Sequence, residues 1–162
     1  MSGAYPGFVA LPAVVGRAGG VATLHLRAQP GSSSLRRDWL SDAVGTLDVP
    51  MVTLADLIAR YGVPAYCKVD VEGSEEDVFA TLPHPLPLVS FEYLDTALDR
   101  AAACLGMLAP DGGAEANLGL SGPPRFLLPE WLPPDELLRR LPDLIREGRA
   151  RSWGDIWVRR RS

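Results

Sequence analysis

Two apolar runs near the amino terminus predict β-strands. Residues 8–15 are apolar throughout, and residues 21–26 form a second, mostly apolar run. The glycines between Gly16 and Gly20 allow the chain to turn back, so the two runs predict a hairpin-like pair of strands. Residues 29–48 are polar and contain Gly31 followed by three serines. They predict a long loop, and loops of this length usually bind a ligand or are disordered.

A helix follows, with signals for both of its ends. The segment Thr53-Leu54-Ala55-Asp56 is a variant of the capping box, with Asp56 in place of the usual Glu or Gln. Apolar residues then recur on one helical face, at Leu54, Leu57, Ile58 and Tyr61. Gly62 stands where a helix commonly ends.

Strands and helices then alternate. Residues 66–71 and 88–93 are apolar runs that predict strands. Gly73 allows a tight turn after the first strand, and Ser74 with Asp77 predicts a short capped helix through Leu82. A second helix is expected over residues 95–105. This order predicts parallel strands joined by crossover helices, and therefore an α/β fold.

The pattern shortens toward the carboxyl terminus. Residues 115–120 and 126–128 predict two short strands, and residues 135–147 predict a helix that is broken or kinked at Pro142. Alternation at Ile156 and Val158 predicts a strand over residues 153–159, which we place at the edge of the sheet.

The densest group of charged residues lies at the expected carboxyl ends of two strands. Alternation places Lys68 and Asp70 on one strand face, with Glu72 just beyond them and Glu92 at the end of the next strand. In open parallel sheets ligands bind at this edge, so three carboxylates and the chain's one lysine are expected to converge on a binding rim.

Structural and metal-binding interpretations of these residues stay open. Lys68 and Asp70 could form a pair that serves only to neutralise both charges. Alternatively, Asp70, Glu72 and Glu92 could hold a divalent cation as hard oxygen ligands, giving a metal-dependent enzyme. The adjacent Lys68 opposes that interpretation, because it would repel the cation.

The composition is that of a globular domain of 162 residues, and we expect one core. The net charge of −4 provides no basic field for nucleic acid or an anionic membrane, and Arg159-Arg160-Arg161 favours a solvated tail. Cys67 and Cys104 show no metal-ligand or disulfide spacing, which favours a reducing cytoplasm. The apolar run at residues 8–15 is far too short to span a membrane.

Several of these segments, in this order, resemble the FkbM family of methyltransferases. The helix start at residues 53–58 is similar to the family's Thr-Leu-Asp-Asp-Leu segment, and residues 68–75 resemble its Lys-Ile-Asp-Val-Glu-Gly-x-Glu segment. Residues 13–24 are similar to its Ala-Val hairpin, and Ser33-Ser34-Leu35 to its Ser-Ser-Leu loop. Residues 90–93 and 153–156 resemble its next and closing strands.

The resemblance implies a Rossmann-like class I methyltransferase sheet, mostly parallel with an antiparallel closing strand and helices on both faces. It implies O-methylation by S-adenosylmethionine of a hydroxyl on a sugar or secondary metabolite. Asp70 would lie between cofactor and acceptor, oriented by Lys68, while Glu72 would shape the acceptor side. Ala13 and Val14 would border the adenine, and the acceptor would contact Glu92, Ser33 and Ser34.

The sequence departs from the family at its beginning. No strand and glycine-rich loop of the kind that cradles the cofactor precede Phe8. We therefore expect residues 1–162 to form a single domain without its N-terminal strands, binding S-adenosylmethionine weakly and self-associating or pairing with a complementing chain. A non-catalytic remnant that needs a partner chain is the alternative.

Overall fold

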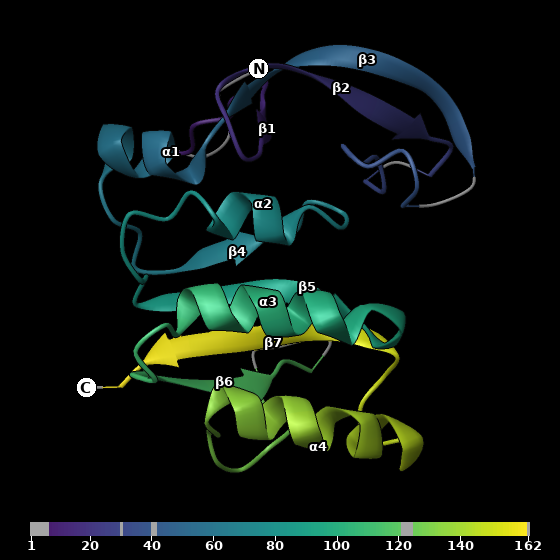
Figure 1. Ribbon diagram of the computed structural model, residues 1–162. Helices are drawn as coiled ribbons and strands as arrows, with labels where there is room; N and C mark the ends of the chain where they lie inside the picture. Colours follow the sequence, from purple (N-terminus) through teal and green to yellow (C-terminus); the bar gives the residue numbers. More distant parts are fainter. Residues whose placement is uncertain (1–6, 30, 40–41, 121–124, 162) are drawn as a thin grey trace.

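The chain folds into two sheets with helices packed beside them, as the computed structural model shows (Figure 1). The structure describes residues 7–29, 31–39, 42–120 and 125–161. Helices and strands are mixed along the chain, so the expected α/β class is confirmed. Among the described helices, none is long and apolar enough to cross a membrane.

The first sheet differs from the expected hairpin. Its strands are β1 (Val14–Val15), β2 (Gly20–Arg27) and β3 (Ala43–Val52), in the order β1-β3-β2. Strand β3 pairs antiparallel with β2 and parallel with β1, so the prediction that residues 8–15 and 21–26 pair with each other is wrong.

The predicted loop over residues 29–48 is also wrong in its second half, where β3 begins at Ala43. Most of β3 is exposed on both faces. Hydrophobic alternation reports burial of one strand face, so a strand held mainly by backbone pairing leaves no such pattern.

Helix α1 (Leu54–Tyr61) confirms the sequence signals at both ends. The Thr53 hydroxyl accepts a hydrogen bond from the Asp56 amide at 3.0 Å, and the Asp56 carboxylate accepts one from the Thr53 amide at 3.1 Å. Leu54 and Ile58 are buried on the inner face, and Gly62 ends the helix with a φ of +88°.

The second sheet contains β4 (Cys67–Val69), β5 (Leu88–Leu94), β6 (Ala114–Leu118) and β7 (Trp153–Arg160), in the order β4-β5-β7-β6. The first three strands run in one direction and β7 runs in the other. The prediction of β7 as an edge strand is wrong, because it lies between β5 and β6. Ile156 pairs with Phe91 on one side and Leu118 on the other, and it is fully buried.

Three helices, α2 (Glu75–Phe79), α3 (Leu98–Leu108) and α4 (Pro134–Arg146), lie on one face of this sheet (Figure 1). A short 3₁₀ turn, η1 (Asp95–Ala97), leads into α3. We expected helices on both faces of this sheet, whereas α2, α3 and α4 share one face. Phe79 of α2 contacts Phe91 of β5 edge-on, with ring centroids 5.5 Å apart, so the core lies between these helices and the sheet.

Three local details correct the sequence prediction. Helix α4 continues through Pro142 without a break. Ser74 precedes α2 as its N-cap residue but makes no capping hydrogen bond with its side chain, and α2 ends at Phe79 rather than Leu82. Residues 126–128 form no strand; an isolated bridge joins Phe126 to Gly119.

Candidate functional site

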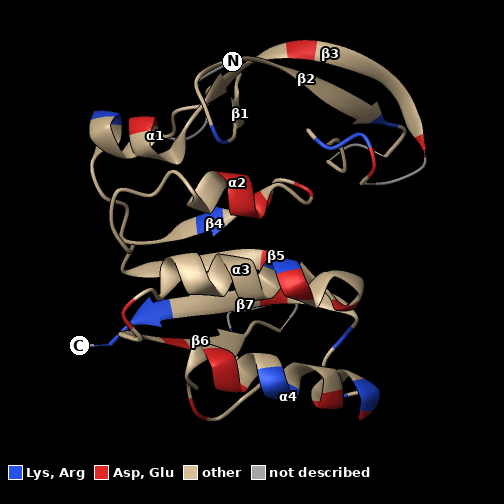
Figure 2. Ribbon diagram, in the orientation of Figure 1, with Lys and Arg blue, Asp and Glu red and all other residues tan. Residues whose placement is uncertain are grey.

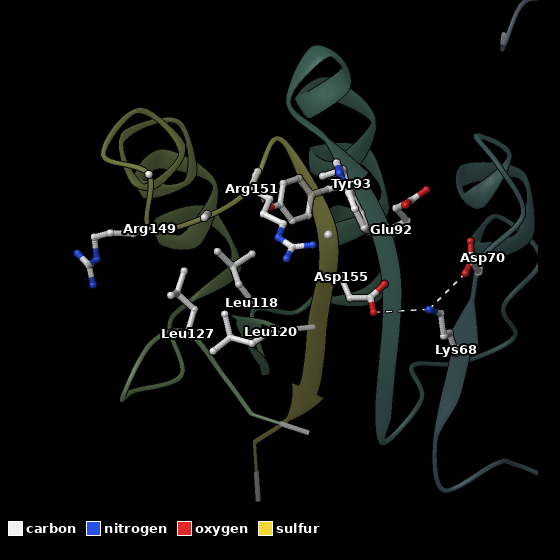
Figure 3. A pocket seen from close by; sticks show the side chains of 15 residues that line it. Lys68, Asp70, Glu92, Tyr93, Leu118, Leu120, Leu127, Arg149, Arg151 and Asp155 are labelled. Carbon is white, nitrogen blue, oxygen red and sulfur yellow. Dashed lines mark hydrogen bonds and ion pairs between the residues drawn. The ribbon is translucent and has the colours of Figure 1, made fainter. Parts of the chain in front are cut away.

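A cavity of about 340 Å³ opens at the edge of the sheet where β4, β5 and β6 end and β7 begins (Figure 3). Lys68 and Asp70 reach it from β4 and the turn after it, and Glu92 from the end of β5. Asp155 contributes from the start of β7, opposite Glu92 in the strand register. The structure thus places the sequence-predicted rim residues at the carboxyl ends of the strands, as expected.

Lys68 joins two carboxylates in this cavity. Its ammonium nitrogen lies 3.2 Å from an Asp70 oxygen and 3.5 Å from an Asp155 oxygen. Burial lowers the pKa of Lys68, but the negative charges of Asp155 and Asp70 outweigh it and the pKa is raised overall. Lys68 therefore stays positive at neutral pH, and its predicted contact with Asp70 is present.

Asp155 was not among the sequence-predicted site residues. It lies in the segment at residues 153–156 that resembles the family's closing strand, but nothing local marks its carboxylate as part of the rim. Only the pairing of β7 with β5 brings Asp155 beside Lys68. That pairing joins residues far apart in the sequence, so a local pattern could not reveal it.

Three carboxylates converge beside Lys68. Asp70, Glu72 and Glu92 each offer an oxygen, and these oxygens lie within 4.8 Å of one another. Burial raises the pKa of Glu92 to about 7, with further contributions from the negative charges of Glu72 and Asp70. Glu92 can therefore gain or lose a proton near neutral pH, which suits a general acid or base.

A metal ion is a second possible occupant of these carboxylates, as the sequence suggested. Their spacing suits a divalent cation bound by oxygen ligands. The ammonium group of Lys68, 3.2 Å from Asp70, already neutralises one of the three charges and would repel a second cation. The geometry therefore favours a proton on Glu92 over a metal ion at this position.

Glu72 is held in an unusual backbone conformation. Its φ is +53°, a left-handed value that non-glycine residues seldom adopt. The Ser34 hydroxyl donates a hydrogen bond of 2.6 Å to the Glu72 carbonyl, and the Trp39 indole donates one of 3.2 Å to the Glu72 carboxylate. The loop after β2 therefore fixes both the backbone and the side chain of Glu72.

The turn that carries Glu72 is also held from within. Glu75 is buried, and its carboxylate accepts hydrogen bonds of 3.3 Å from the amides of Val71 and Gly73. Burial raises the pKa of Glu75, although these amides oppose the shift. Acidic residues gather at the start of α2 (Figure 2). Glu75, one of them, stabilises the preceding turn through its hydrogen bonds to the two amides.

The serines predicted to contact the acceptor make hydrogen bonds within the protein. Ser34 is buried, and besides donating to Glu72 its hydroxyl accepts a hydrogen bond of 3.0 Å from the Arg36 amide. The Ser33 hydroxyl accepts one of 3.3 Å from the Arg27 amide. In this structure the two serines order the loop, and a role in substrate binding stays a prediction.

Ala13 and Val14 were predicted to border the adenine, and the structure places Ala13 directly before the first sheet and Val14 within it. Val14 belongs to β1 and pairs with Met51 of β3. Neither residue is among the described residues that line the cavity around Lys68. Their predicted contact with a cofactor therefore concerns a different part of the molecule from the carboxylates.

Comparison with known proteins gives one match. Residues 8–100, more than half of the chain, match the family model of the methyltransferase FkbM domain. This range includes Lys68, Asp70, Glu72 and Glu92, but it ends before Asp155. No curated protein and no solved structure matches the chain.

Proposed function

The chain belongs to the FkbM methyltransferase family, and we propose that it transfers a methyl group from S-adenosylmethionine to a hydroxyl group of a small acceptor, such as a sugar or a secondary metabolite. The observation that carries this proposal is the meeting of Asp70, Glu72 and Glu92 at the carboxyl edge of the sheet. In open α/β sheets ligands bind at that edge.

The strand directions support a Rossmann-like sheet of the class I methyltransferase type. Strands β4, β5 and β6 run in one direction, and β7, the last strand of the chain, runs in the other. The resemblance implies this combination of a mostly parallel sheet with an antiparallel closing strand.

The donor set fits the charged end of the proposed cofactor. S-adenosylmethionine supplies, when bound, a methyl group on a positively charged sulfur and also carries an ammonium group. Carboxylates are suitable partners for both cations. Asp70, oriented by Lys68, would hold this end, and Glu72, held by Trp39, would shape the acceptor side. Contact of Ala13 and Val14 with the adenine remains part of the proposal.

The residues of this chain would act mainly by positioning the acceptor hydroxyl. Methyl transfer is an in-line displacement, and holding the two reacting atoms in line supplies much of the catalytic effect. Glu92 would accept the hydroxyl proton on a carboxylate oxygen, because its pKa of about 7 lets it take up a proton near neutral pH. Asp70, held by Lys68, would keep the hydroxyl directed at the methyl group.

A direct test supplies the chain with S-adenosylmethionine labelled in its methyl group and a mixture of sugars and polyketide-type alcohols. A millimolar concentration of the cofactor allows for weak binding. We expect mass spectrometry to find the label in a methyl ether. Label on nitrogen or carbon instead would contradict the proposed acceptor class, and absence of any labelled product would contradict methyl transfer by this chain.

The same assay separates positioning from proton transfer. Asp70→Asn should abolish the methyl ether at every pH. Glu92→Gln should leave residual transfer that no longer rises between pH 6 and 8, because the titrating carboxylate is gone. If Glu92→Gln keeps the pH dependence of the native chain, another group takes the proton.

A further inference from the structure

The cavity is lined by side chains of both charges. Asp70, Glu92 and Asp155 lie together on one side, around Lys68. On the other side Arg151 enters from the turn that joins α4 to β7. Figure 3 shows the Arg151 guanidinium pointing into the cavity. A ligand in the cavity would therefore meet carboxylates on the side of Lys68 and a guanidinium on the side of Arg151.

Arg151 is held in place but keeps its donors open. Its carbonyl accepts a hydrogen bond of 3.0 Å from the Tyr93 hydroxyl, which ties the turn to the end of β5. Its guanidinium lies over the Trp153 ring, 5.5 Å from the centroid. Within the described part of the chain, no ion pair involves Arg151. A guanidinium stacked on an aromatic ring still presents its N–H groups to an anion in the plane of the group.

The neighbouring Arg149 differs from Arg151 in its ion pairing and in the direction of its side chain. Arg149 also lines the cavity, but its guanidinium pairs with Glu147 at 3.6 Å, and Figure 3 shows it pointing away from Lys68 and the carboxylates. The two arginines are two positions apart on the same turn and carry the same charge. They therefore form a matched pair in which the Arg151 guanidinium points towards Asp155 and the Arg149 guanidinium points away from it.

The wall beside Arg151 is apolar. Leu118, Leu120 and Leu127 line it, and their side chains are drawn next to the guanidinium in Figure 3. Arg151 is exposed to solvent, and this wall adds apolar contact beside its guanidinium. The wall also suits the carbon skeleton of a ligand. A volume of about 340 Å³ accommodates a small molecule.

We propose that the methyl acceptor carries an anionic group, a carboxylate or phosphate, which Arg151 binds while the reacting hydroxyl lies beside Asp70 and Glu92. This inference rests on the proposed methyl transfer to a hydroxyl. It adds a class of acceptor to that function. The family match covers residues 8–100, and Arg151 lies outside this range.

The charge arrangement would also fix the direction in which the acceptor binds. An anionic group near Asp70 and Glu92 would be repelled, whereas Arg151 attracts it to its own side of the cavity. The hydroxyl end of the molecule is then left beside the carboxylates. A neutral acceptor of the same size would lack this orientation and should bind more weakly.

Binding of two matched probes tests the proposal. 4-Nitrophenyl β-D-glucuronide and 4-nitrophenyl β-D-glucoside share their ring hydroxyls and aromatic group. They differ at one carbon, where the glucuronide has a carboxylate and the glucoside a hydroxymethyl group. We expect ligand-observed NMR titration to give tighter binding of the glucuronide by about tenfold, because a hydrogen bond to a charged group contributes about 1.5 kcal/mol or more. The preference should decrease with added salt.

Two variants test which arginine causes the preference for the glucuronide. Arg151→Gln should remove it, whereas Arg149→Gln, with the same loss of charge, should retain it; circular dichroism checks that both are folded. Equal loss in both variants, no preference in the native chain, or no binding of either probe would overturn the proposal. Binding is measured without methyl transfer, so an enzyme that methylates hydroxyls but lacks the preference would refute this inference alone.

Discussion

The Trp39 indole donates a hydrogen bond of 3.2 Å to the Glu72 carboxylate, although 33 positions separate the two residues. The Trp39 ring also lies against Gly73, and the Arg100 guanidinium lies over that ring, 5.5 Å from its centroid. Arg100 in turn donates a hydrogen bond of 2.8 Å to the Gly73 carbonyl. The turn after β4, which carries one of the three carboxylates, is thus enclosed by the loop that follows β2.

Replacing Trp39→Phe keeps an aromatic ring against Gly73 but removes the hydrogen bond to Glu72. The Glu72 carboxylate can then move away from Glu92, so its negative charge should raise the pKa of Glu92 less. We expect a lower pKa for Glu92 and a stability loss of about 1 kcal/mol. Titration of the Glu92 carboxyl carbon by NMR measures the first, and urea unfolding the second. An unchanged pKa would mean that Trp39 has a packing role only.

Gly73 allows a direct test of the close approach of Trp39. Its φ is +91°, and an added Cβ would overlap the Trp39 ring. Gly112 also has a positive φ, +68°, but open space around it, so Gly112→Ala should cost only the backbone strain of about 1 kcal/mol. Gly73→Ala should cost more, by about 1–3 kcal/mol of overpacking. Equal losses in urea unfolding would show that the Trp39 ring moves aside without cost.

Asp70→Asn should abolish methyl transfer with little change in stability. The Lys68 and Asp70 side chains are each 45% exposed, and half-exposed ion pairs contribute at most about 1 kcal/mol. Lys68→Met should lower transfer by disorienting Asp70. The double-mutant cycle separates the two roles. If Asp70→Asn unfolds the chain and Lys68→Met restores the fold in the double variant, Asp70 is a structural ion-pair partner.

The sequence predicted the elements whose signals are local. The capping box at Thr53 and the apolar runs of β4 and β5 depend on neighbouring residues, and the structure confirms them. The rim with Lys68, Asp70 and Glu92 followed from the same elements, because parallel strands end at one edge.

Features that depend on distant pairing could not be predicted in this way. Strand β3 is mostly exposed, so it lacks the alternation that burial imposes. The position of β7 inside the sheet, and with it the contact of Asp155 with Lys68, depends on which strands pair. Trp39 stands in a polar segment, where nothing local indicates that its indole contacts Glu72.

Stability should decrease between about pH 4.5 and 7 through Glu92. Its pKa is near 4.5 in an unfolded chain and about 7 in the folded protein. In this window the folded state holds a proton that the unfolded state has lost, so raising the pH favours unfolding until Glu92 is ionised in both states. Glu92→Gln should remove this part of the pH dependence. Urea midpoints at pH 5 and pH 8 for both proteins measure it, and an equal difference in both would show that Glu92 does not contribute.

The edge of β4 leads to a prediction about association. Within the described residues β4 pairs with β5 alone, so its other side presents unpaired backbone groups. Such an edge can pair with a strand of a second chain. However, β4 has only three residues and carries Lys68 at its centre, and both features limit pairing between edges. We therefore expect weak, concentration-dependent self-association.

Size-exclusion chromatography with light scattering measures this association. We expect the mean mass to rise above 17.4 kDa as the concentration is increased over a hundredfold range. Ala65→Lys adds a second positive charge close to Lys68, in the exposed segment that leads into β4, and should shift the rise to higher concentration. Val44→Lys places the same charge on an exposed position of β3, in the other sheet, and should leave the association unchanged. An equal effect of both variants would show that the chains associate through general hydrophobic contact, and a constant monomer mass would show that the β4 edge stays unpaired in solution.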